Sequence, residues 1–350
     1  MSMHQSENGA PLRVAVVGYG YWGPNLVRNV AERPEMELAG LCEMDPERGA
    51  AFSARMPGYP VWSDLEDVVS DDTIDAVLVA TPPRTHHAIA HAALSAGKHV
   101  LVEKPLAKTA AEALDLVELA RANGLTLMPG HTFLYSPPVN KIRDLIKSDQ
   151  LGEVYFVTSS RMNLGKYQSD GVICDLAPHD LSILLYLLEQ PVVSIAASAR
   201  SVFQEGVPEV AFLTLTFASG TTANVQISWL APRKVREMVV VGSQKMVQYD
   251  DTAADESVRV FDRGMDFKTP ENFGEHQLSY RSGDIVIPRV DAAEPLGLEL
   301  ADFAHAIRTG ERPRSHAELG YEIVAAVEAA EESLRLGGAP VAVAPLGAAL

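Results

Sequence analysis

Residues 12–27 read Leu12-Arg13-Val14-Ala15-Val16-Val17-Gly18-Tyr19-Gly20-Tyr21-Trp22-Gly23-Pro24-Asn25-Leu26-Val27, and this stretch decides the fold. Apart from Arg13, its first six residues form a short apolar run, which is typical of a parallel strand buried on both faces. Gly18, Gly20 and Gly23 follow in G-x-G-x-x-G spacing, and apolar residues then recur with the period of a helix. The stretch therefore predicts a strand, a tight glycine turn and a helix.

A glycine turn of this spacing is the fingerprint of a dinucleotide-binding βαβ unit. The first glycine permits the turn, the second lets the backbone approach a pyrophosphate, and the third lets helix and strand pack closely. Free N–H groups at the helix start would face the phosphates. The fingerprint also includes an acidic residue about twenty positions after the glycine turn. Glu43 ends the next apolar run, and its carboxylate could accept hydrogen bonds from the ribose hydroxyls. We expect a bound dinucleotide here, with an ordinary strand-turn-helix as the alternative.

Length and composition bound the class of protein. The 350 residues suffice for about two domains of ~150 residues each. Hydrophobic residues make up 47% and charged residues 21%, which is ordinary for a soluble globular enzyme. The formal net charge of −17 argues against nucleic acid as a partner, because a phosphate-binding surface needs clustered lysine and arginine.

The cysteines and the N-terminal residues indicate the compartment. Cys42 and Cys174 lie far apart in different predicted elements, which favours a reduced, intracellular environment. Residues 1–10 are polar and lack the apolar segment of a signal peptide, and no run approaches the ~18 apolar residues of a membrane span. We expect a cytoplasmic protein with no membrane partner.

Strands and helices alternate through the first part of the chain. Apolar runs at 36–42, 74–80 and 99–102 predict buried strands, and capped or amphipathic segments between them predict helices. This alternation favours α/β architecture with a doubly wound parallel sheet. Ligands bind at the carboxyl ends of such strands. We therefore expect the cofactor site to comprise the following residues: Gly18, Tyr19, Gly20, Tyr21, Trp22, Gly23, Glu43, Thr81, Pro82, Glu103 and Lys104.

Beyond Pro138 the pattern changes to strands with alternating apolar and polar residues. They are expected at 154–160, 192–200, 210–217, 221–229, 238–241 and 246–249. Alternation of this kind indicates a largely antiparallel sheet with one face solvated or covered by another subunit. A helix is expected at 175–188, irregular structure at 251–295, and two helices at 296–309 and 317–336. We expect a dinucleotide-binding domain at 1–132 and a substrate-binding and oligomerisation domain at 133–350.

Three polar residues have the chemistry of a catalytic site. Lys104 ends a predicted strand beside the cofactor cleft, where an ammonium can donate to a substrate hydroxyl; the alternative is a solvated surface charge. Asp175 and His179 are four positions apart in the sequence, so they share one face if the segment is helical. A neutral His179 suits the role of general base, because its ordinary pKa lies near 6.5. The alternative for His179 is a structural histidine.

The glycine turn, the tripeptide Glu103-Lys104-Pro105 and the Asp175-x-x-x-His179 pair together resemble the glucose-fructose oxidoreductase, inositol 2-dehydrogenase and MocA (Gfo/Idh/MocA) family. The resemblance covers about residues 12–336. It implies an N-terminal Rossmann domain with bound NAD and a C-terminal α/β domain whose open sheet serves substrate binding and oligomerisation. It also implies catalytic roles for Lys104, Asp175 and His179, with the histidine as acid/base and the lysine positioning the hydroxyl.

Within the family, segments 161–165 and 175–180 are most similar to enzymes that oxidise the 3-hydroxyl of nucleotide sugars, such as UDP-N-acetylglucosamine 3-dehydrogenases. Relatives often carry tryptophan where Cys174 stands, so the shape of the sugar pocket stays open. The residues expected to bind substrate are Lys104, His131, Arg161, Asn163, Lys166 and His179. For His131 domain packing is an equal alternative, and for Arg161, Asn163 and Lys166 the alternative is an exposed loop.

Two other polar groups are kept out of the site. His86, His87 and His91 lie on one predicted helix, and no accompanying acid or cysteine pattern supports a metal, so we interpret them as a helix surface. The basic segment 233–236 fits either a solvated hairpin tip or an interface edge. We therefore expect no metal site.

The leading hypothesis is an NAD-dependent sugar dehydrogenase or reductase acting on CH–OH groups, with a homodimer or homotetramer as its assembly. Its substrate would be a nucleotide sugar, and inositol or a free sugar is the alternative. A second hypothesis is an NAD-dependent glycoside hydrolase or dehydratase with no net redox change, and a third is a non-catalytic NAD-binding sensor.

Overall fold

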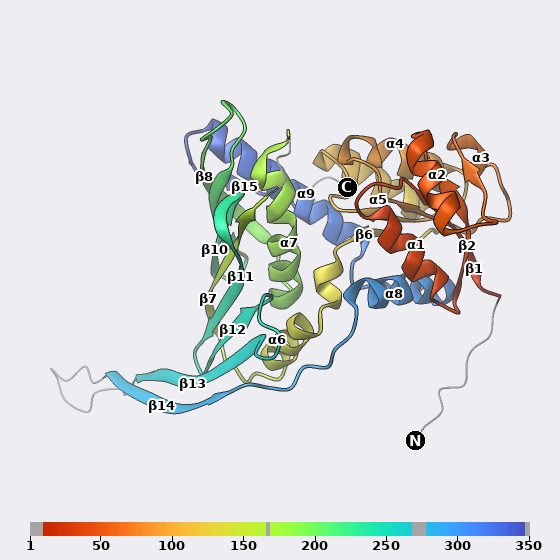
Figure 1. Ribbon diagram of the computed structural model, residues 1–350. Helices are drawn as coiled ribbons and strands as arrows, with labels where there is room; N and C mark the ends of the chain where they lie inside the picture. The colour runs from red at the N-terminus through yellow and green to blue at the C-terminus, as the bar shows by residue number, and fades with distance from the viewer. Residues whose placement is uncertain (1–9, 166–168, 268–277, 347–350) are drawn as a thin grey trace, which may run out of the picture. The chain divides into compact units, whose positions relative to one another are not determined.

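The structure is a computed structural model that describes residues 10–165, 169–267 and 278–346. The chain divides into two units (Figure 1). Unit 1 comprises Met1–Gly130 and Leu296–Tyr321, and unit 2 comprises His131–Pro295 and Glu322–Leu350. A segment from the far end of the chain thus returns to unit 1, although the sequence-based division expected it in the second domain.

Unit 1 is built on a six-stranded sheet of order β3-β2-β1-β4-β5-β6, and every described pair in it is parallel. The predicted doubly wound parallel sheet is confirmed. Its strands are β1 (Leu12–Val17), β2 (Met36–Cys42), β3 (Val61–Trp62), β4 (Ala76–Val79), β5 (His99–Glu103) and β6 (Leu127–Gly130). Its helices are α1 (Gly23–Ala31), α2 (Pro46–Arg55), α3 (Glu66–Val69), η1 (Pro83–Thr85), α4 (His86–Ser95), α5 (Ala110–Asn123) and α8 (Pro295–Thr309).

Local sequence signals set the ends of these helices. At the start of α2 the carboxylate of Asp45 accepts the backbone N–H groups of Glu47 and Arg48. At the start of α5, Thr109 and Glu112 form the reciprocal capping box that the sequence predicts, and Gly124 ends the helix with φ of 66°. Because β1 and β4 are neighbours while the strand order reverses between them, the glycine turn after β1 lies at the topological switch point of the sheet.

Unit 2 is built on a nine-stranded sheet of order β14-β13-β12-β11-β7-β10-β9-β8-β15. β7 and β10 run parallel and the other described pairs are antiparallel, so the expected largely antiparallel sheet is confirmed. Its strands are β7 (Val154–Leu164), β8 (Val192–Arg200), β9 (Val210–Phe217), β10 (Thr222–Ser228), β11 (Leu230–Gly242), β12 (Met246–Asp250), β13 (Val258–Phe267), β14 (Leu278–Val286) and β15 (Val341–Ala342). Its helices are η2 (Thr132–Tyr135), α6 (Pro137–Lys147) and α7 (Gly171–Leu188), and α9 (Ala317–Arg335) begins in unit 1 and ends in unit 2.

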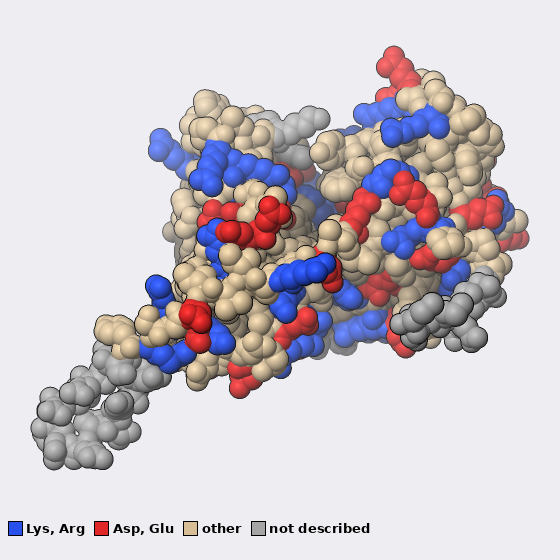
Figure 2. All heavy atoms as spheres, turned by 60° about the horizontal axis from the view of Figure 1, so that its bottom comes forward, with Lys and Arg blue, Asp and Glu red and all other residues tan. Residues whose placement is uncertain are grey.

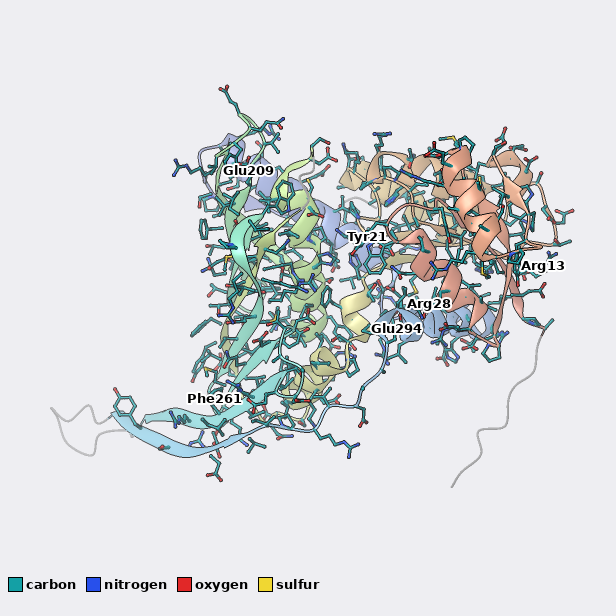
Figure 3. The ribbon with its side chains drawn as sticks, in the orientation of Figure 1. Arg13, Tyr21, Arg28, Glu209, Phe261 and Glu294 are labelled. Carbon is teal, nitrogen blue, oxygen red and sulfur yellow. The ribbon has the colours of Figure 1, made fainter. Side chains whose placement is uncertain are left out.

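The expectation of irregular structure at 251–295 is wrong, because β13 and β14 lie there and pair with each other. Polar residues such as Arg259 and Asp262 interrupt the apolar positions of β13, which hid its alternation. Only part of the strand needs apolar residues: Val258 and Val260 are buried, whereas Phe261, labelled in Figure 3, is half-buried. Strands near a sheet edge carry such charged positions because one side of the ladder meets solvent.

The central helix of unit 2 is α7, which contacts β7, β9 and β10. By length and composition it could span a membrane, but 78% of its apolar window is buried inside the protein, as in a core helix. Acidic and basic side chains are interspersed on the face of the molecule shown in Figure 2.

Candidate active site

The glycine turn after β1 is shaped by close backbone contacts. A Cβ atom on Gly23 would lie 2.4 Å from the carbonyl oxygen of Gly18, and Gly18 itself has φ of 95°. Both positions therefore require glycine. Gly20 is different, because the nearest atom to an added Cβ would be Nη1 of Arg48 at 3.9 Å. The open space at Gly20 suits the close approach of a ligand to the backbone, as the fingerprint requires.

The aromatic residues of this turn have different environments. Tyr19 is buried and its ring meets that of Phe52 edge-on, with 5.4 Å between centroids. Tyr21 is 83% exposed and Trp22 is 37% exposed, and Figure 3 labels Tyr21 on this turn. Tyr19 thus packs in the core of unit 1, whereas Tyr21 and Trp22 have surface available for a ligand.

Glu43 fastens the glycine turn to the end of β2. Its Oε2 accepts the backbone N–H of Tyr19 at 2.7 Å, and its Oε1 accepts the N–H of Asp45 at 2.9 Å. Each carboxylate oxygen has a second lone pair, so these bonds leave capacity to accept ribose hydroxyls. Glu43 therefore has a structural role in addition to the ligand role that the sequence predicts.

The start of α1 has the features of an anion-binding helix terminus. Trp22 is the N-cap residue and its side chain makes no capping hydrogen bond, and Pro24 stands in the first turn. The positive end of the helix dipole is therefore available to a phosphate group. The six glycine-turn positions and Glu43 thus lie together in unit 1.

Thr81 follows β4, and its backbone carbonyl contacts a histidine. The ring of His86 is 1% exposed, with Nε2 at 2.8 Å from the carbonyl oxygen of Thr81 and Nδ1 at 2.7 Å from that of Pro105. The interpretation of His86 as a helix-surface residue is therefore wrong: it starts α4 facing the core. Pro82, next to Thr81, is exposed.

His87 and His91 do lie on the surface of α4. Nε2 of His87 contacts Oδ2 of Asp115 on α5 at 2.7 Å, and the corresponding distance from His91 is 3.9 Å. Asp115 is an acid that the sequence pattern did not associate with these histidines. Among the residues that the structure describes, no group of three such side chains has the arrangement of a metal site.

The carboxyl end of β5 carries a buried acid beside a lysine. Glu103 is 7% exposed, and burial raises the pKa of its carboxyl to about 7, against the opposing effect of the Lys104 ammonium. Lys104 is half-buried. Partial burial of an ammonium next to an acid is a setting in which a lysine can donate to a substrate oxygen.

In unit 2, α7 presents the predicted carboxylate and imidazole. Asp175 accepts a hydrogen bond of 3.0 Å from the indole Nε1 of Trp229, which is 4% exposed. His179 lies one helical turn later, and its ring meets that of Phe133 edge-on, with 5.3 Å between centroids. Each of the two side chains thus contacts an aromatic residue from outside α7 in the same unit.

Behind His179 lies a buried ion pair that the sequence did not reveal. Arg161 of β7 donates from Nε to Oδ2 of Asp180 at 2.7 Å, and Ser159 donates to Oδ1 of the same carboxylate at 2.7 Å. The guanidinium carbon of Arg161 is also 4.5 Å from the centroid of the Phe133 ring. Asp180 follows His179 directly in α7, so the pair anchors the helix next to the imidazole.

The remaining candidates for substrate binding are placed as follows. His131 and Arg161 are buried, at 1% and 3% exposure, whereas Asn163 on β7 is half-buried. Lys166 lies outside the described residues. In the basic segment 233–236, Arg236 pairs with Asp251 at 2.9 Å, and the segment overlaps the register shift of β11 between Leu230 and Val235.

The positions that sequence reasoning missed are Phe133, Trp229 and Asp180. In the sequence, Phe133 is an aromatic residue after β6, Trp229 is the last residue of an expected strand, and Asp180 is a second acid in α7. Asp180 alone had a signal, because an aspartate in an otherwise apolar stretch of a buried helix needs a partner.

Comparison with known proteins assigns both parts of the chain. Residues 12–131 match the family model described as "Oxidoreductase family, NAD-binding Rossmann fold", and residues 139–248 match the Gfo/Idh/MocA C-terminal domain. Inositol 2-dehydrogenase 1 of Saccharopolyspora erythraea is 30% identical over 227 residues, which are 62% of this chain and 67% of that protein.

Two solved structures are similar over most of their length. An oxidoreductase from Magnetospirillum magnetotacticum is 31% identical with a TM-score of 0.76, covering 91% of this chain and 99% of that chain. UDP-N-acetylglucosamine 3-dehydrogenase GnnA from Acidithiobacillus ferrooxidans is 22% identical with a TM-score of 0.78, covering 92% and 97% of the two chains. At 22% identity, the similarity to GnnA shows a shared fold.

Proposed function

Because the chain belongs to the Gfo/Idh/MocA family of oxidoreductases with an NAD-binding Rossmann fold, we propose that it moves hydride between NAD and a secondary alcohol carbon of a sugar or cyclitol. The inositol 2-dehydrogenase relative supports this class of substrate.

The residues of unit 1 fit a dinucleotide. Two features of the glycine turn support this: a Cβ on Gly23 would lie 2.4 Å from the carbonyl oxygen of Gly18, so helix and strand pack closely, and Gly20 leaves its backbone open to a pyrophosphate. In the proposal the start of α1 binds the phosphates, and Glu43 accepts the ribose hydroxyls while it holds the turn. When bound, the cofactor supplies the hydride chemistry, and the protein supplies position and proton transfer.

The observation that carries the proposal is the pair of Asp175 and His179 on α7, each fixed by an aromatic residue. A general base must be held within hydrogen-bonding reach of the hydroxyl whose proton it removes. Phe133 limits the freedom of the imidazole, and Trp229 limits that of the carboxylate. We assign His179 as the acid/base and Asp175 as its supporting carboxylate.

Lys104 is proposed to donate a hydrogen bond to the reacting oxygen. An ammonium has three donors and no acceptor, so it orients a hydroxyl and stabilises negative charge as the proton leaves. Of the other candidates, Asn163 remains a proposed substrate contact. Arg161 and His131 are buried, and in our proposal they support the site without touching substrate.

We further propose a nucleotide sugar oxidised at its 3-hydroxyl as the substrate. This rests on the resemblance of segments 161–165 and 175–180 to enzymes of that activity. A panel of nucleotide sugars, inositols and free hexoses, assayed with NAD for the appearance of NADH absorbance, tests it. Turnover of inositol alone would contradict the nucleotide-sugar assignment and leave the dehydrogenase assignment intact.

Substitution of the proposed groups tests the mechanism. His179→Ala should lower turnover of the best substrate by on the order of 10² to 10⁴ with NADH affinity unchanged. Lys104→Ala should lower kcat and raise KM together, because the ammonium contacts the hydroxyl in both ground and transition states.

Matched controls are available elsewhere in the chain. His87→Ala removes a half-buried histidine of α4, and Lys108→Ala removes an exposed lysine four residues after Lys104. Both should retain turnover. If His179→Ala or Lys104→Ala is folded, binds NADH normally and turns over within about threefold of the parent, a difference of only ~0.65 kcal/mol, the assigned role is wrong.

A further inference from the structure

Trp229, between β10 and β11, is bonded through its backbone to two other segments of unit 2. Its N–H donates to the carbonyl oxygen of Glu209 at 2.9 Å, and its carbonyl oxygen accepts the N–H of Gly165 at 3.2 Å. Because Val210 of β9 pairs with Ser228 of β10 in antiparallel register, Glu209 stands directly opposite Trp229. Gly165 and Glu209 are therefore the backbone neighbours of this tryptophan.

Gly165 packs against the indole ring itself. A Cβ atom on Gly165 would lie 2.4 Å from Cδ1 of Trp229 and 2.8 Å from Cγ. These distances are far below van der Waals contact, so no side chain fits at Gly165 while the indole keeps its position. The φ angle of Gly165 lies outside the left-handed region, so close packing alone requires glycine here.

The side chain of Glu209 lies on the same face of the sheet as the indole. Residues directly opposite in an antiparallel pair project from one face with their Cβ atoms about 5 Å apart. The indole bonds to α7, so this is the face that α7 covers. Glu209, labelled in Figure 3, is 1% exposed and Trp229 is 4% exposed. The two side chains are therefore buried neighbours.

The carboxylate of Glu209 organises the loop between β8 and β9. Its Oε2 accepts the N–H of Val202 at 2.5 Å, and its Oε1 accepts the N–H groups of Phe203 and Gln204, each at 3.1 Å. The side chains of Val202 and Phe203 are 46% and 82% exposed, so burial of apolar side chains does not hold this part of the loop. The bonds to the buried carboxylate hold it instead.

This loop and the indole both contact α7. The indole Nε1 donates to Oδ2 of Asp175 at 3.0 Å. The carbonyl oxygen of Pro208, next to Glu209, accepts the N–H of Val172 at 2.9 Å in the first turn of α7. The segment that ends in Glu209 therefore contacts both members of the pair formed by Trp229 and Asp175.

We propose that Gly165 and Glu209 are positioning residues that fix the indole of Trp229, so that its N–H stays bonded to Asp175. The consequence for catalysis rests on the proposed function of Asp175 as the carboxylate that supports His179. The placement of the indole is a property of unit 2 alone and can be observed without turnover.

Two substitutions disturb the indole from different segments without touching Asp175. Gly165→Ala introduces a methyl group where the ring now lies, so the indole must move. Glu209→Gln keeps the shape of the side chain but replaces an accepting oxygen with an NH₂ group, so at least one loop N–H loses its partner.

The direct test is the indole N–H signal in a ¹H–¹⁵N spectrum. The chain has three tryptophans, and the signal of Trp229 is assigned by its loss in Trp229→Phe. In the parent we expect slow exchange of this proton with solvent, because the group is buried and bonded. In Gly165→Ala and in Glu209→Gln the signal should shift and exchange about tenfold faster or more. An unchanged signal in either variant would overturn the role of that residue.

Kinetics of the same variants test the consequence for the site. Gly165→Ala and Glu209→Gln should each lower kcat about three- to tenfold with NADH affinity unchanged, because a small misplacement of a supporting group slows the chemical step. Trp229→Phe, which removes the N–H donor, should lower kcat by a similar factor. Adding Gly165→Ala to Trp229→Phe should change kcat by less than about twofold, since both act through one bond.

The control is Ser333→Ala. Ser333 is fully buried on α9, and its Oγ accepts the N–H of Ala197 on β8 at 2.9 Å. The variant therefore also removes an acceptor from a backbone N–H of unit 2. It should lose thermal stability as Glu209→Gln does, and leave the indole signal in place and kcat within about twofold of the parent. An equal change of the indole signal in Ser333→Ala would overturn the proposal.

The outcomes separate this proposal from the proposed function. If the indole proton exchanges faster in Gly165→Ala and Glu209→Gln while kcat stays within about twofold, the two residues do fix the indole and the supporting role of Asp175 fails. A loss of kcat with an unchanged indole signal would overturn the positioning roles of Gly165 and Glu209.

Discussion

The carboxylate of Glu43 accepts the N–H of Tyr19, and we propose that it also accepts hydrogen bonds from the ribose of NAD. A carboxylate at this position repels a 2′-phosphate, so we predict tighter binding of NADH than of NADPH. Arg48 is the first basic residue after Glu43 in the sequence, and its guanidinium pairs with the carboxylate of Asp45 at 3.4 Å. Titration calorimetry with both cofactors checks this, and tighter binding of NADPH would contradict it.

Glu103 makes the stability of unit 1 depend on pH. Its pKa is about 7 in the folded protein, raised from 4.5 by burial, so the folded state binds a proton that the unfolded state releases earlier. The stability from this group is fully present below pH 4.5 and is lost as pH rises through 7.

We therefore predict that Glu103→Gln flattens the pH dependence of unfolding between pH 5 and 8. Between pH 5 and pH 8 the free energy of unfolding of the parent should fall by about 2.5 kcal/mol more than that of the variant. Urea unfolding of parent and variant at several pH values measures it. Parallel curves for the two proteins would show that the carboxyl is not the titrating group.

At the scale of elements, the pair of Arg161 and Asp180 ties α7 to β7. The two side chains are 4% and 3% exposed. Removing one partner of a buried pair leaves an uncompensated charge, so Asp180→Asn should lower the free energy of unfolding by about 3–5 kcal/mol.

The matched control for that pair is Glu189→Gln at the end of the same helix. Glu189 is 51% exposed and pairs with Lys147 at 2.9 Å and with Arg143, so its substitution should cost about 0–1 kcal/mol for each of these two pairs. Urea unfolding compares the two variants. Equal destabilisation by the two substitutions would mean that burial does not determine how much the Arg161–Asp180 pair contributes to the free energy of unfolding.

The short helix η2 affects α7 through Phe133. We predict that Phe133→Leu lowers kcat about two- to tenfold, because an edge-on aromatic pair contributes about 0.5–1.5 kcal/mol to holding His179. NADH affinity should not change. Phe217→Leu, at a fully buried site of β9, should lower thermal stability without lowering kcat. Steady-state kinetics and thermal unfolding of both variants test this prediction, and an equal kcat in the two variants would contradict it.

At the scale of the whole molecule, one face of the unit 2 sheet exposes aromatic side chains. Figure 1 shows α6 and α7 against one face of this sheet, and Arg161 of β7 contacts α7 on that side. Because side chains alternate along a strand, Phe156 points to the opposite face, and Phe212 shares that face through the register of β10. These two rings are 42% and 46% exposed.

We predict that this face mediates formation of a homodimer or homotetramer, because exposed apolar sheet surface favours association. Light scattering should give two or four times the chain mass of 37.8 kDa. Phe212→Glu should shift the mass toward the monomer. A monomeric parent at micromolar concentration would contradict the prediction.

The elements of unit 1 and most strands of unit 2 were predictable from the sequence, because glycine spacing, caps and apolar periodicity act between residues close in the chain. The same local reasoning identified the Asp175–His179 pair, since a helix alone puts them on one face. It failed at β13 and β14, where each strand is completed by pairing with the other and needs few apolar residues of its own.

The sequence by itself therefore determined the parallel sheet with its glycine turn, the mainly antiparallel second sheet, and the residue types available for chemistry. Only the tertiary structure decided which groups touch. The contact of His86 with Pro105 and the bonds of Trp229 to Asp175 and of Arg161 to Asp180 join residues 19, 54 and 19 positions apart, and the return of 296–321 to unit 1 spans far more. Such contacts depend on how whole elements pack, and the pattern of neighbouring residues carries no signal of them.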